Sequence, residues 1–278
     1  MRYLLYNPLS GLGTAEEIAK NYALTLAEPS LLVDMTRDDV ASIVQKMAND
    51  DSIVLFGGDG TLNCFVNTVD TDTLVGVVYY LPTGTGNDFF TDLKAHRTNE
   101  PVEITKYLSL LPRVKIGEME KKFINGVGYG IDGYCCEVGD AIKAQGKMPN
   151  YTSIAITGLL FHYKPCGATV VVDGVLHRYE KVWIAPTMLG GYYGGGMMPA
   201  PEQKRENGHL SLMVFHGSGK MRTLMIFPSI FSGKHIEHKK YVEVLEGKEI
   251  TVTFDEARPL QIDGETILGV KEYTAYIE

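Results

Sequence analysis

Apolar and polar positions alternate along the first third of the chain in a way that predicts strands and helices in turn. Short apolar runs predict buried strands at 2–6, 30–35, 52–56 and 74–81. Amphipathic segments between and after them predict helices at 14–27, 37–49 and 61–69. Strands that alternate with helices indicate a parallel sheet covered on both faces. We therefore expect a Rossmann-like parallel α/β domain at the start of the chain.

From about residue 113 the pattern changes to shorter runs, which are typical of strands with one buried face. Strands are expected at 113–119, 122–127, 168–172, 178–187, 210–215, 241–246, 250–254 and 260–263, and helices at 134–145, 151–163 and 220–231. Asp173-Gly174, between two of these strands, is a strong hairpin signal. The pattern predicts a β-sandwich-like second domain, so that the chain divides into domains 1–120 and 121–278.

The composition of the chain argues against nucleic acid as a partner and against insertion into a membrane. The chain has 278 residues and a formal net charge of −8, which argues against a nucleic-acid-binding surface. Its longest apolar runs are much shorter than the roughly 20 residues that span a bilayer, so we expect no transmembrane segment. The four cysteines lack metal-site or disulfide spacing, which favours reduced thiols in the cytoplasm. The densest basic cluster, residues 234–240, is more simply a solvated helix end than a lipid-headgroup site.

The residues after the third predicted strand read Gly57-Gly58-Asp59-Gly60-Thr61. Glycines allow the backbone to approach a ligand closely, and the N-terminus of the helix that follows favours an anion. Because Asp59 would repel a phosphate unless a metal lies between them, the pattern indicates a site for a metal-bound nucleotide. The alternative is a tight glycine-rich turn in which Asp59 caps a helix.

Two other predicted strands are also followed by small and polar residues, at 7–11 and at 82–90. Neighbouring parallel strands end at the same edge of a sheet, where ligands bind in α/β folds. We therefore expect the three loops to converge on one site. None of them matches the Gly-Lys-Ser/Thr ending of the P-loop.

Three strings occur in a characteristic order: Asn7-Pro8-x-Ser10-Gly11, Gly57-Gly58-Asp59-Gly60-Thr61-x-Asn63 and Pro82-x-Gly84-Thr85-Gly86-Asn87-Asp88-Phe89. In this order and spacing they resemble the diacylglycerol kinase catalytic-domain family, which includes bacterial lipid kinases and, more distantly, sphingosine and ceramide kinases. The resemblance continues through 125–132, 194–201 and 261–265, and so covers nearly the whole chain. The second string is shared with NAD kinases, whereas the third favours lipid kinases.

The resemblance implies an ATP-dependent kinase of lipid metabolism that phosphorylates a hydroxyl of a diacylglycerol-like or long-chain lipid at a membrane surface. It implies ATP and Mg²⁺ as cofactors and an active site in the interdomain cleft. Asp59 resembles the carboxylate that organises Mg²⁺ and phosphates, and Glu265 resembles the general base. Without the family context, Asp263-Gly264-Glu265 is more simply a β-turn. The positions that resemble nucleotide contacts are Asn7, Ser10, Gly11, Thr36, Gly57, Gly58, Asp59, Gly60, Thr61, Asn63, Gly84, Thr85, Asn87 and Asp88.

The chain departs from the family pattern in several places. Cys64 stands where the family usually has Glu, and Asn207 stands where many bacterial members have an Asp that resembles a structural Mg²⁺ ligand. Asp59 and Asn207 are thus the metal-ligand candidates, and a neutral amide binds a hard cation less well than a carboxylate. The chain also ends soon after Glu265, from which we expect a looser hinge between the domains.

Two other functions are open on the sequence. One is a NAD kinase-like phosphotransferase with a soluble acceptor, and the other is a nucleotide- or lipid-binding regulatory protein with weak or no activity. The sequence leaves the lipid unnamed and the oligomeric state, including a homodimer, open.

Overall fold

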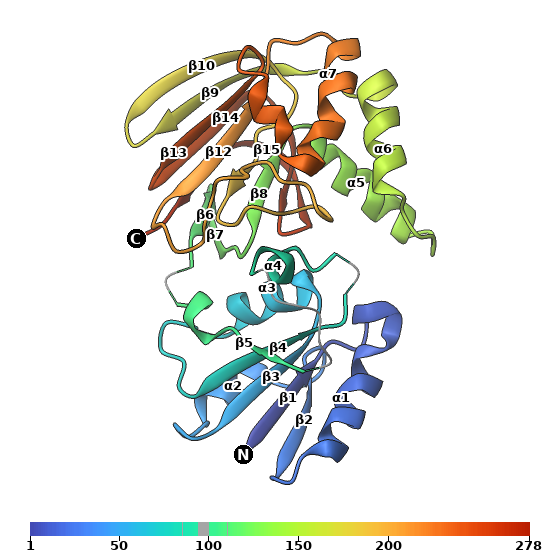
Figure 1. Ribbon diagram of the computed structural model, residues 1–278, viewed down its shortest axis with the longest axis vertical. Helices are drawn as coiled ribbons and strands as arrows, with labels where there is room; N and C mark the ends of the chain where they lie inside the picture. The colour runs from blue at the N-terminus through green and yellow to red at the C-terminus, as the bar shows by residue number, and fades with distance from the viewer. Residues whose placement is uncertain (85, 94–99, 110) are drawn as a thin grey trace. The chain divides into compact units, whose positions relative to one another are not determined.

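The computed structural model describes residues 1–84, 86–93, 100–109 and 111–278 (Figure 1). The chain divides into two compact units, Met1–Leu111 and Pro112–Glu278, each with its own sheet. The division into a nucleotide-binding domain 1–120 and a substrate domain 121–278 stays a prediction. The helices that the structure describes are all too short or too polar to cross a membrane.

The first unit is built on a five-stranded sheet of order β2-β1-β3-β4-β5. Its parallel strands are β1 (Arg2–Tyr6), β2 (Ser30–Asp34), β3 (Ser52–Gly57) and β4 (Val77–Pro82). The short β5 (Val102–Glu103), which the sequence pattern did not predict, pairs antiparallel with β4. The predicted Rossmann-like α/β architecture is confirmed.

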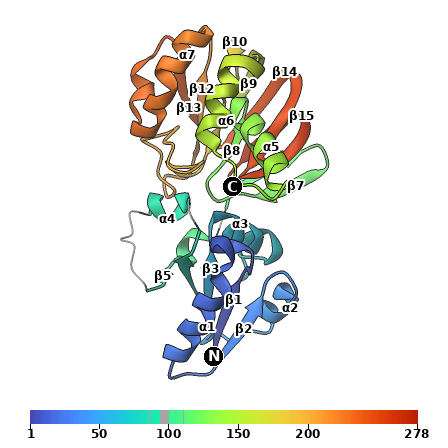
Figure 2. The same cartoon turned by 90° about the vertical axis from the view of Figure 1, so that its right-hand side faces the viewer.

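The strand order reverses at β1, and this reversal places the helices. Right-handed crossovers to β2 on one side of β1 and to β3 on the other put α1 and α2 on opposite faces of the sheet, as Figure 2 shows. Leu4, Val54 and Phe56 form an apolar cluster with Ala19 of α1. The helical elements are η1 (Ser10–Gly13), α1 (Ala15–Thr25), α2 (Val40–Gln45), α3 (Asp59–Thr68), α4 (Asp88–Asp92) and η2 (Thr105–Tyr107).

The second unit is the predicted β-sandwich-like domain. Its strands are β6 (Arg113–Ile116), β7 (Met119–Lys122), β8 (Gly126–Tyr129), β9 (Cys166–Val172), β10 (Val175–Val182), β11 (Thr187–Met188), β12 (Leu210–Phe215), β13 (Val242–Gly247), β14 (Glu249–Ile262) and β15 (Glu265–Tyr276). The first part of β14 pairs with β9 and its last residues pair with β8. A register shift between Thr253 and Arg258 separates the two parts. A strand that bends in this way can serve both layers of a sandwich.

Helices cover one side of the second unit (Figure 1). They are α5 (Ile131–Lys143), α6 (Tyr151–Thr157), the π-turn η3 (Gly158–His162), α7 (Lys220–Ile226), η4 (Phe227–Ser232) and η5 (Lys234–Glu237). Ile154, Leu159 and Ile226 are buried in one cluster with Trp183 and Phe215. The inner residues of the predicted helix at 151–163 are therefore part of the core of the second unit.

Candidate functional site

Three loops meet at the edge of the first sheet where β1 and β3 end. Ser10 Oγ accepts a hydrogen bond of 3.1 Å from Gly58 N, and Thr83 N donates 2.8 Å to Gly57 O. Gly58 and Gly84 approach so closely that a Cβ atom at Gly84 would lie 2.8 Å from Gly58 Cα. The convergence predicted from the sequence is confirmed, and it occurs at the point where the strand order reverses. Ligands of open α/β sheets bind at such a point.

The close approach of these loops predicts unequal effects of two glycine substitutions. Gly84→Ala should lower the free energy of unfolding by about 1–3 kcal/mol, because the new Cβ meets backbone that cannot rotate away. Gly60→Ala is the control, since apart from its chain neighbours and the backbone of its own helix no atom of the described residues lies within 4 Å of its Cβ position. It should be neutral or stabilising by about 0.5–1 kcal/mol. Urea denaturation of both variants measures the difference, and equal stabilities would contradict the tight contact between the loops.

Asp59 is the first residue of α3, and its carboxylate is oriented by the third loop. Its Oδ2 accepts a hydrogen bond of 2.8 Å from Asp88 N, and its Oδ1 accepts one of 3.2 Å from Phe89 N. These are the first backbone N–H groups of α4, whereas the N-cap of α3 itself is Gly58. Asp59 therefore links two of the loops. It helps to cap α4, although it is itself the first residue of α3.

A second carboxylate lies near that of Asp59. A Cβ atom at Gly86 would lie 3.9 Å from Asp59 Oδ2 and 4.0 Å from Asp88 Oδ2, so the two carboxylates flank the same glycine. Tyr80, buried below, donates 3.1 Å to Gly57 O. Burial, and then the negative charge of Asp59, raise the pKa of Tyr80 well above its usual value. Two carboxylates beside glycine-lined backbone suit Mg²⁺ bound to phosphates.

Two further predicted contacts, Asn7 and Thr36, lie after β1 and β2. Asn7 Oδ1 accepts 2.9 Å from Leu9 N and so closes the turn that presents Ser10. Thr36 N and Oγ1 donate 2.9 Å and 2.7 Å to Asp34 Oδ1. The hydrogen bond from the Thr36 hydroxyl is the main cause that lowers the pKa of Asp34. Asp34 was not predicted, although its place at the end of β2 is the same signal that identified the other loops.

Asn87 is the N-cap of α4, with a left-handed φ of 50°, and its Nδ2 donates 2.5 Å to Gly84 O. Its Oδ1 and Thr83 Oγ1 are buried polar atoms without a hydrogen-bond partner among the described residues. A bound ligand could satisfy both atoms.

The other predicted positions of this unit are placed as follows. Thr61 and Asn63 are buried in α3, and a Cβ at Gly57 would collide with the Thr61 side chain. Gly11 lies in η1. Cys64 is exposed on α3, 3.9 Å from Thr68 Oγ1. Thr85 lies outside the described residues.

Glu265 is the first residue of β15 in the second unit. Both of its carboxylate oxygens accept hydrogen bonds from Lys121 Nζ of β7, at 2.8 Å and 2.7 Å. The Glu265 side chain is 54% exposed and that of Lys121 is 28% exposed. Lys121 was not predicted, because no local pattern connects residues that are 144 positions apart.

The turn before Glu265 is held by a dense set of hydrogen bonds. Asp263 and Gly264 have φ values of 47° and 91°, and Ile262 pairs with Glu265 across them. The Asp263 carboxylate accepts from Ile124 N, Asn125 N and Gly126 N at 2.6, 2.8 and 3.0 Å. The turn alternative for this tripeptide is thus observed. Because the turn is fixed to a neighbouring strand, it positions Glu265 firmly.

Asp132 of α5 supports the same turn from below. Gln261 Nε2 donates 2.9 Å to Asp132 Oδ2, and Gln261 Oε1 accepts 2.6 Å from Gly264 N. Burial raises the pKa of Asp132 to about 6, and the hydrogen bond from Gln261 opposes this shift.

The raised pKa of Asp132 predicts a pH-dependent stability. Between the usual pKa of 3.8 and the folded value of about 6, the folded chain holds a proton that the unfolded chain has lost. The free energy of unfolding should therefore fall, by about 1–3 kcal/mol, as the pH rises through this window. The side chain of Asp132→Asn cannot ionise. The free energy of unfolding of this variant should therefore not fall over this pH range, and the variant should be more stable than wild type at about pH 7.5.

Denaturant titrations at about pH 5 and about pH 7.5 measure the difference between wild type and Asp132→Asn. Glu137→Gln, an exposed position on the same helix, is the control and should keep the wild-type pH dependence. If Asp132→Asn behaved like Glu137→Gln, the carboxyl of Asp132 would not be the group that titrates.

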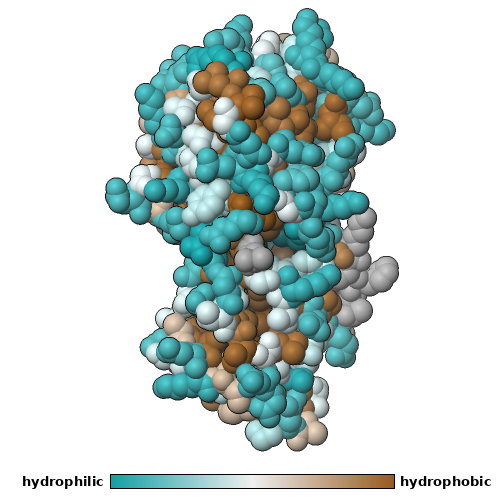
Figure 3. All heavy atoms as spheres, turned by 90° about the vertical axis from the view of Figure 1, so that its left-hand side faces the viewer, coloured by the Kyte–Doolittle hydropathy of each residue, from teal (hydrophilic) through white to brown (hydrophobic). Residues whose placement is uncertain are grey.

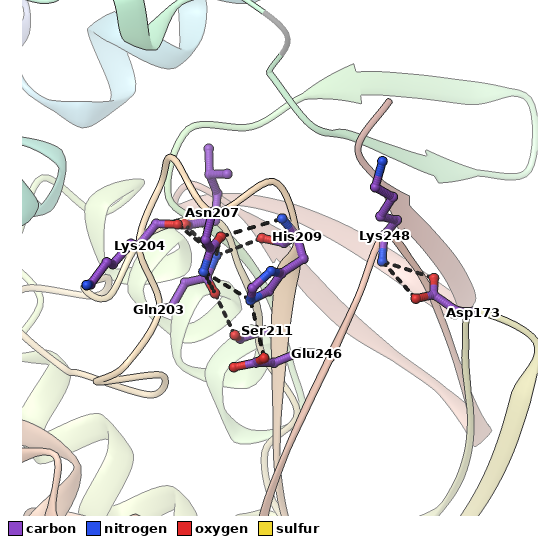
Figure 4. Close-up of polar contacts among 9 residues, drawn as sticks. Asp173, Gln203, Lys204, Asn207, His209, Ser211, Glu246 and Lys248 are labelled. Atoms are coloured by element: carbon purple, nitrogen blue, oxygen red, sulfur yellow. Dashed lines mark hydrogen bonds and ion pairs between the residues drawn. The ribbon is translucent and has the colours of Figure 1, made fainter.

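Asn207 lies within a hydrogen-bonded network on the second unit (Figure 4). Its amide exchanges hydrogen bonds with Gln203 at 3.2 and 3.3 Å, and its Nδ2 lies 3.0 Å from His209 Nε2. His209 Nε2 is 3.3 Å from Glu246 Oε2, and Ser211 Oγ donates to Gln203 Oε1. These side chains are mostly neutral and are hydrogen-bonded to one another, whereas a hard cation prefers charged oxygen ligands. Among the described residues, no three His, Cys, Asp or Glu side chains gather as a metal site. A metal role for Asn207 stays a prediction.

Comparison with protein families gives two matches that together cover most of the chain. The diacylglycerol kinase catalytic domain matches residues 2–119. The YegS C-terminal NAD kinase beta sandwich-like domain matches residues 125–274. The order of the two matches agrees with the α/β unit followed by the β-rich unit.

Individual relatives agree with these matches. A Mycobacterium tuberculosis protein named "Diacylglycerol kinase" is 26% identical over 255 residues, which are 84% of this chain and 79% of that protein. A Staphylococcus aureus protein named "Putative lipid kinase" is 28% identical over 226 residues, 78% of this chain and 72% of that protein. A crystal structure of "a putative diacylglycerol kinase" from Bacillus anthracis covers all of this chain and 92% of that one, with a TM-score of 0.71 and 19% identity. At that identity the structural likeness shows the fold alone.

Proposed function

We propose that this chain, which belongs to the diacylglycerol kinase catalytic-domain family, transfers the γ-phosphate of ATP to a hydroxyl of a diacylglycerol-like or long-chain lipid. The observation that carries the proposal is the meeting of three loops at the switch point of the first sheet, where the carboxylates of Asp59 and Asp88 flank Gly86. The relatives named as diacylglycerol or lipid kinases support the choice of a lipid acceptor.

The loops supply groups that suit a bound triphosphate. Gly58, Gly60 and Gly84 are not fully buried, so phosphate oxygens can approach their backbone, and the N-terminus of α3 favours an anion. Asp59 and Asp88 would hold Mg²⁺, which when bound neutralises charge on the β- and γ-phosphates. Asn7, Ser10, Gly11, Thr36, Gly57, Thr61, Asn63, Thr85 and Asn87 complete the proposed nucleotide-binding set. Most of the rate acceleration comes from alignment and charge neutralisation.

Glu265 is the proposed general base. The acceptor hydroxyl gives its proton to the Glu265 carboxylate as its oxygen bonds to the γ-phosphorus and the bond from that phosphorus to ADP breaks. Lys121 contacts both Glu265 oxygens and would hold this carboxylate in one orientation while the acceptor is absent. The interdomain cleft as the place of transfer stays a prediction. The proposal places the enzyme in the cytoplasm, with transient visits to the membrane surface where its lipid resides.

A second candidate is a NAD kinase-like enzyme with a soluble acceptor. The description of the family that matches residues 125–274 names a NAD kinase-like sandwich, and Gly-Gly-Asp-Gly-Thr is common to both enzyme classes. A third candidate is a regulatory protein without turnover. It is suggested by Cys64, where the family usually has Glu, and by the neutral hydrogen-bonded network at Asn207.

Parallel assays with two acceptors separate these functions. Purified chain is incubated with Mg²⁺, ATP labelled in the γ-phosphate, and either dioctanoylglycerol in mixed micelles or NAD. We expect labelled lipid and no NADP. NADP without labelled lipid would establish the second candidate, whereas ATP binding without either product would indicate the regulatory protein.

A further inference from the structure

The outer surface of α6, η3, α7 and η4 combines exposed apolar residues with helices that carry no Asp or Glu. Phe161, Met221 and Met225 are exposed by 71%, 70% and 69%, and Ile156 and Phe231 by 48% each. We call this set of five residues the α6–α7 surface.

These residues lie on elements that touch each other. Lys220 Nζ at the start of α7 donates 3.1 Å to Leu160 O of η3, so Met221 and Phe161 each follow, in the chain, a residue of this contact. Met221 and Met225 are four residues apart on α7 and therefore share one face. Figures 1 and 2 both show α6 and α7 side by side on the outside of the second unit. The inner residues of the same helices are buried in the core, so the outward residues are not needed to hold the fold together.

Exposed apolar residues occur elsewhere too, as Figure 3 shows for the side opposite to that of Figure 2, and alone they do not identify an interface. The distinguishing feature is charge. Residues 141–172 and 207–236 contain no Asp or Glu, although the whole chain has a net charge of −8. The same two segments contain the basic residues Lys143, Lys147, Lys164, Lys220, Arg222 and Lys234. By contrast, Val175 and Leu176 of β10, which are 60% and 67% exposed, follow Asp173 in the chain.

Exposed apolar side chains on helical segments that carry Lys and Arg but no Asp or Glu fit the interface of an anionic bilayer. The aliphatic stems of Lys and Arg can lie along the apolar region while their charges reach the lipid headgroups. We propose that the α6–α7 surface docks this chain onto an anionic lipid membrane. The choice of partner rests on the proposed function, because a lipid acceptor is reached from a bilayer surface, whereas the surface itself is identified from exposure and charge.

Vesicle flotation without ATP tests the docking apart from catalysis. Wild type should bind vesicles of phosphatidylcholine with phosphatidylglycerol much more tightly than vesicles of phosphatidylcholine alone, and raised salt should weaken this binding. The double variant Phe161→Ser, Met225→Ser should bind the anionic vesicles about tenfold more weakly or worse. Lys164→Gln with Lys234→Gln should lose about tenfold as well. Thermal melts confirm folding, since all four side chains are exposed.

Val175→Ser with Leu176→Ser is the matched control and should bind as wild type does. Equal binding by wild type and the Phe161, Met225 variant, or equal loss in the β10 control, would overturn the docking surface. So would sedimentation showing a wild-type dimer that this variant disperses, because the surface would then join two copies of the chain.

The docking surface and the proposed function can fail separately. Vesicle binding without phosphate transfer would keep the docking surface and end the kinase proposal. Phosphorylation of short-chain dioctanoylglycerol without vesicle binding would do the reverse.

Discussion

Asp59→Asn is expected to lower the rate of phosphate transfer by about a hundredfold to a thousandfold. The substitution keeps the size of the side chain but removes the charge that, with Asp88, would hold Mg²⁺ beside the phosphates. It also places an amide against the N–H groups of Asp88 and Phe89, which now donate to the Asp59 carboxylate at 2.8 and 3.2 Å. We therefore expect a loss of stability of about 1–3 kcal/mol in the same variant.

Because this variant loses both stability and activity, a second aspartate is needed as a control. Asp51 also accepts a backbone hydrogen bond, 2.9 Å from Ala48 N, and pairs with the N-terminal amino group at 2.9 Å. It precedes β3 and so lies at the opposite edge of the sheet. Asp51→Asn should lose stability but keep the transfer rate, measured at a temperature where both variants are folded. If the two variants lost activity in equal measure, Asp59 would have only a structural role.

Glu265→Gln is expected to lower the transfer rate by about a hundredfold to ten-thousandfold while the affinity for ATP is unchanged. Glutamine keeps the shape of the side chain but cannot take the proton of the acceptor hydroxyl. Stability should change little, because the ion pair with Lys121 is partly exposed and such pairs contribute little. Initial rates with saturating ATP, together with calorimetric titration of ATP, measure the two effects separately.

The matched control for Glu265 is Glu272→Gln on the same strand. Glu272 Oε2 accepts 2.6 Å from Thr253 Oγ1 and has no proposed role in transfer. Its variant should retain the full rate. Transfer by Glu265→Gln at a rate close to that of wild type would rule out this carboxylate as the base.

The first unit could be predicted from local sequence patterns, because each pattern lies within a few residues of the strand or loop that it predicts. A buried strand followed by glycines and a hydroxyl predicts a ligand-binding loop wherever it occurs, and parallel strands bring such loops together. Ser10, Gly58 and Gly84 therefore meet as expected. The short α4 was not predicted, because its first turn is fixed by the carboxylate of Asp59, 29 and 30 residues earlier.

The second unit was harder to predict for the same reason. β15 was missed because exposed Glu265, Lys271 and Glu272 break its apolar pattern and Gly269 interrupts it with a φ of 71°. β15 is held as a strand by its antiparallel pairing with β14, which its own sequence pattern does not reveal. Lys121 and Asp132 reach the hairpin of Glu265 only through long-range pairing. The Asp173-Gly174 hairpin was predicted because a two-residue turn is a local signal.

The most direct measurement is transfer of label from γ-labelled ATP into an extracted mixture of lipids, with products identified by mass spectrometry. Wild type should yield a lipid that has gained one phosphate, and Asp59→Asn should yield none above background. Label that stays in the aqueous phase with wild type, or equal labelling by Asp59→Asn, would contradict a lipid kinase whose phosphates lie at this edge of the sheet.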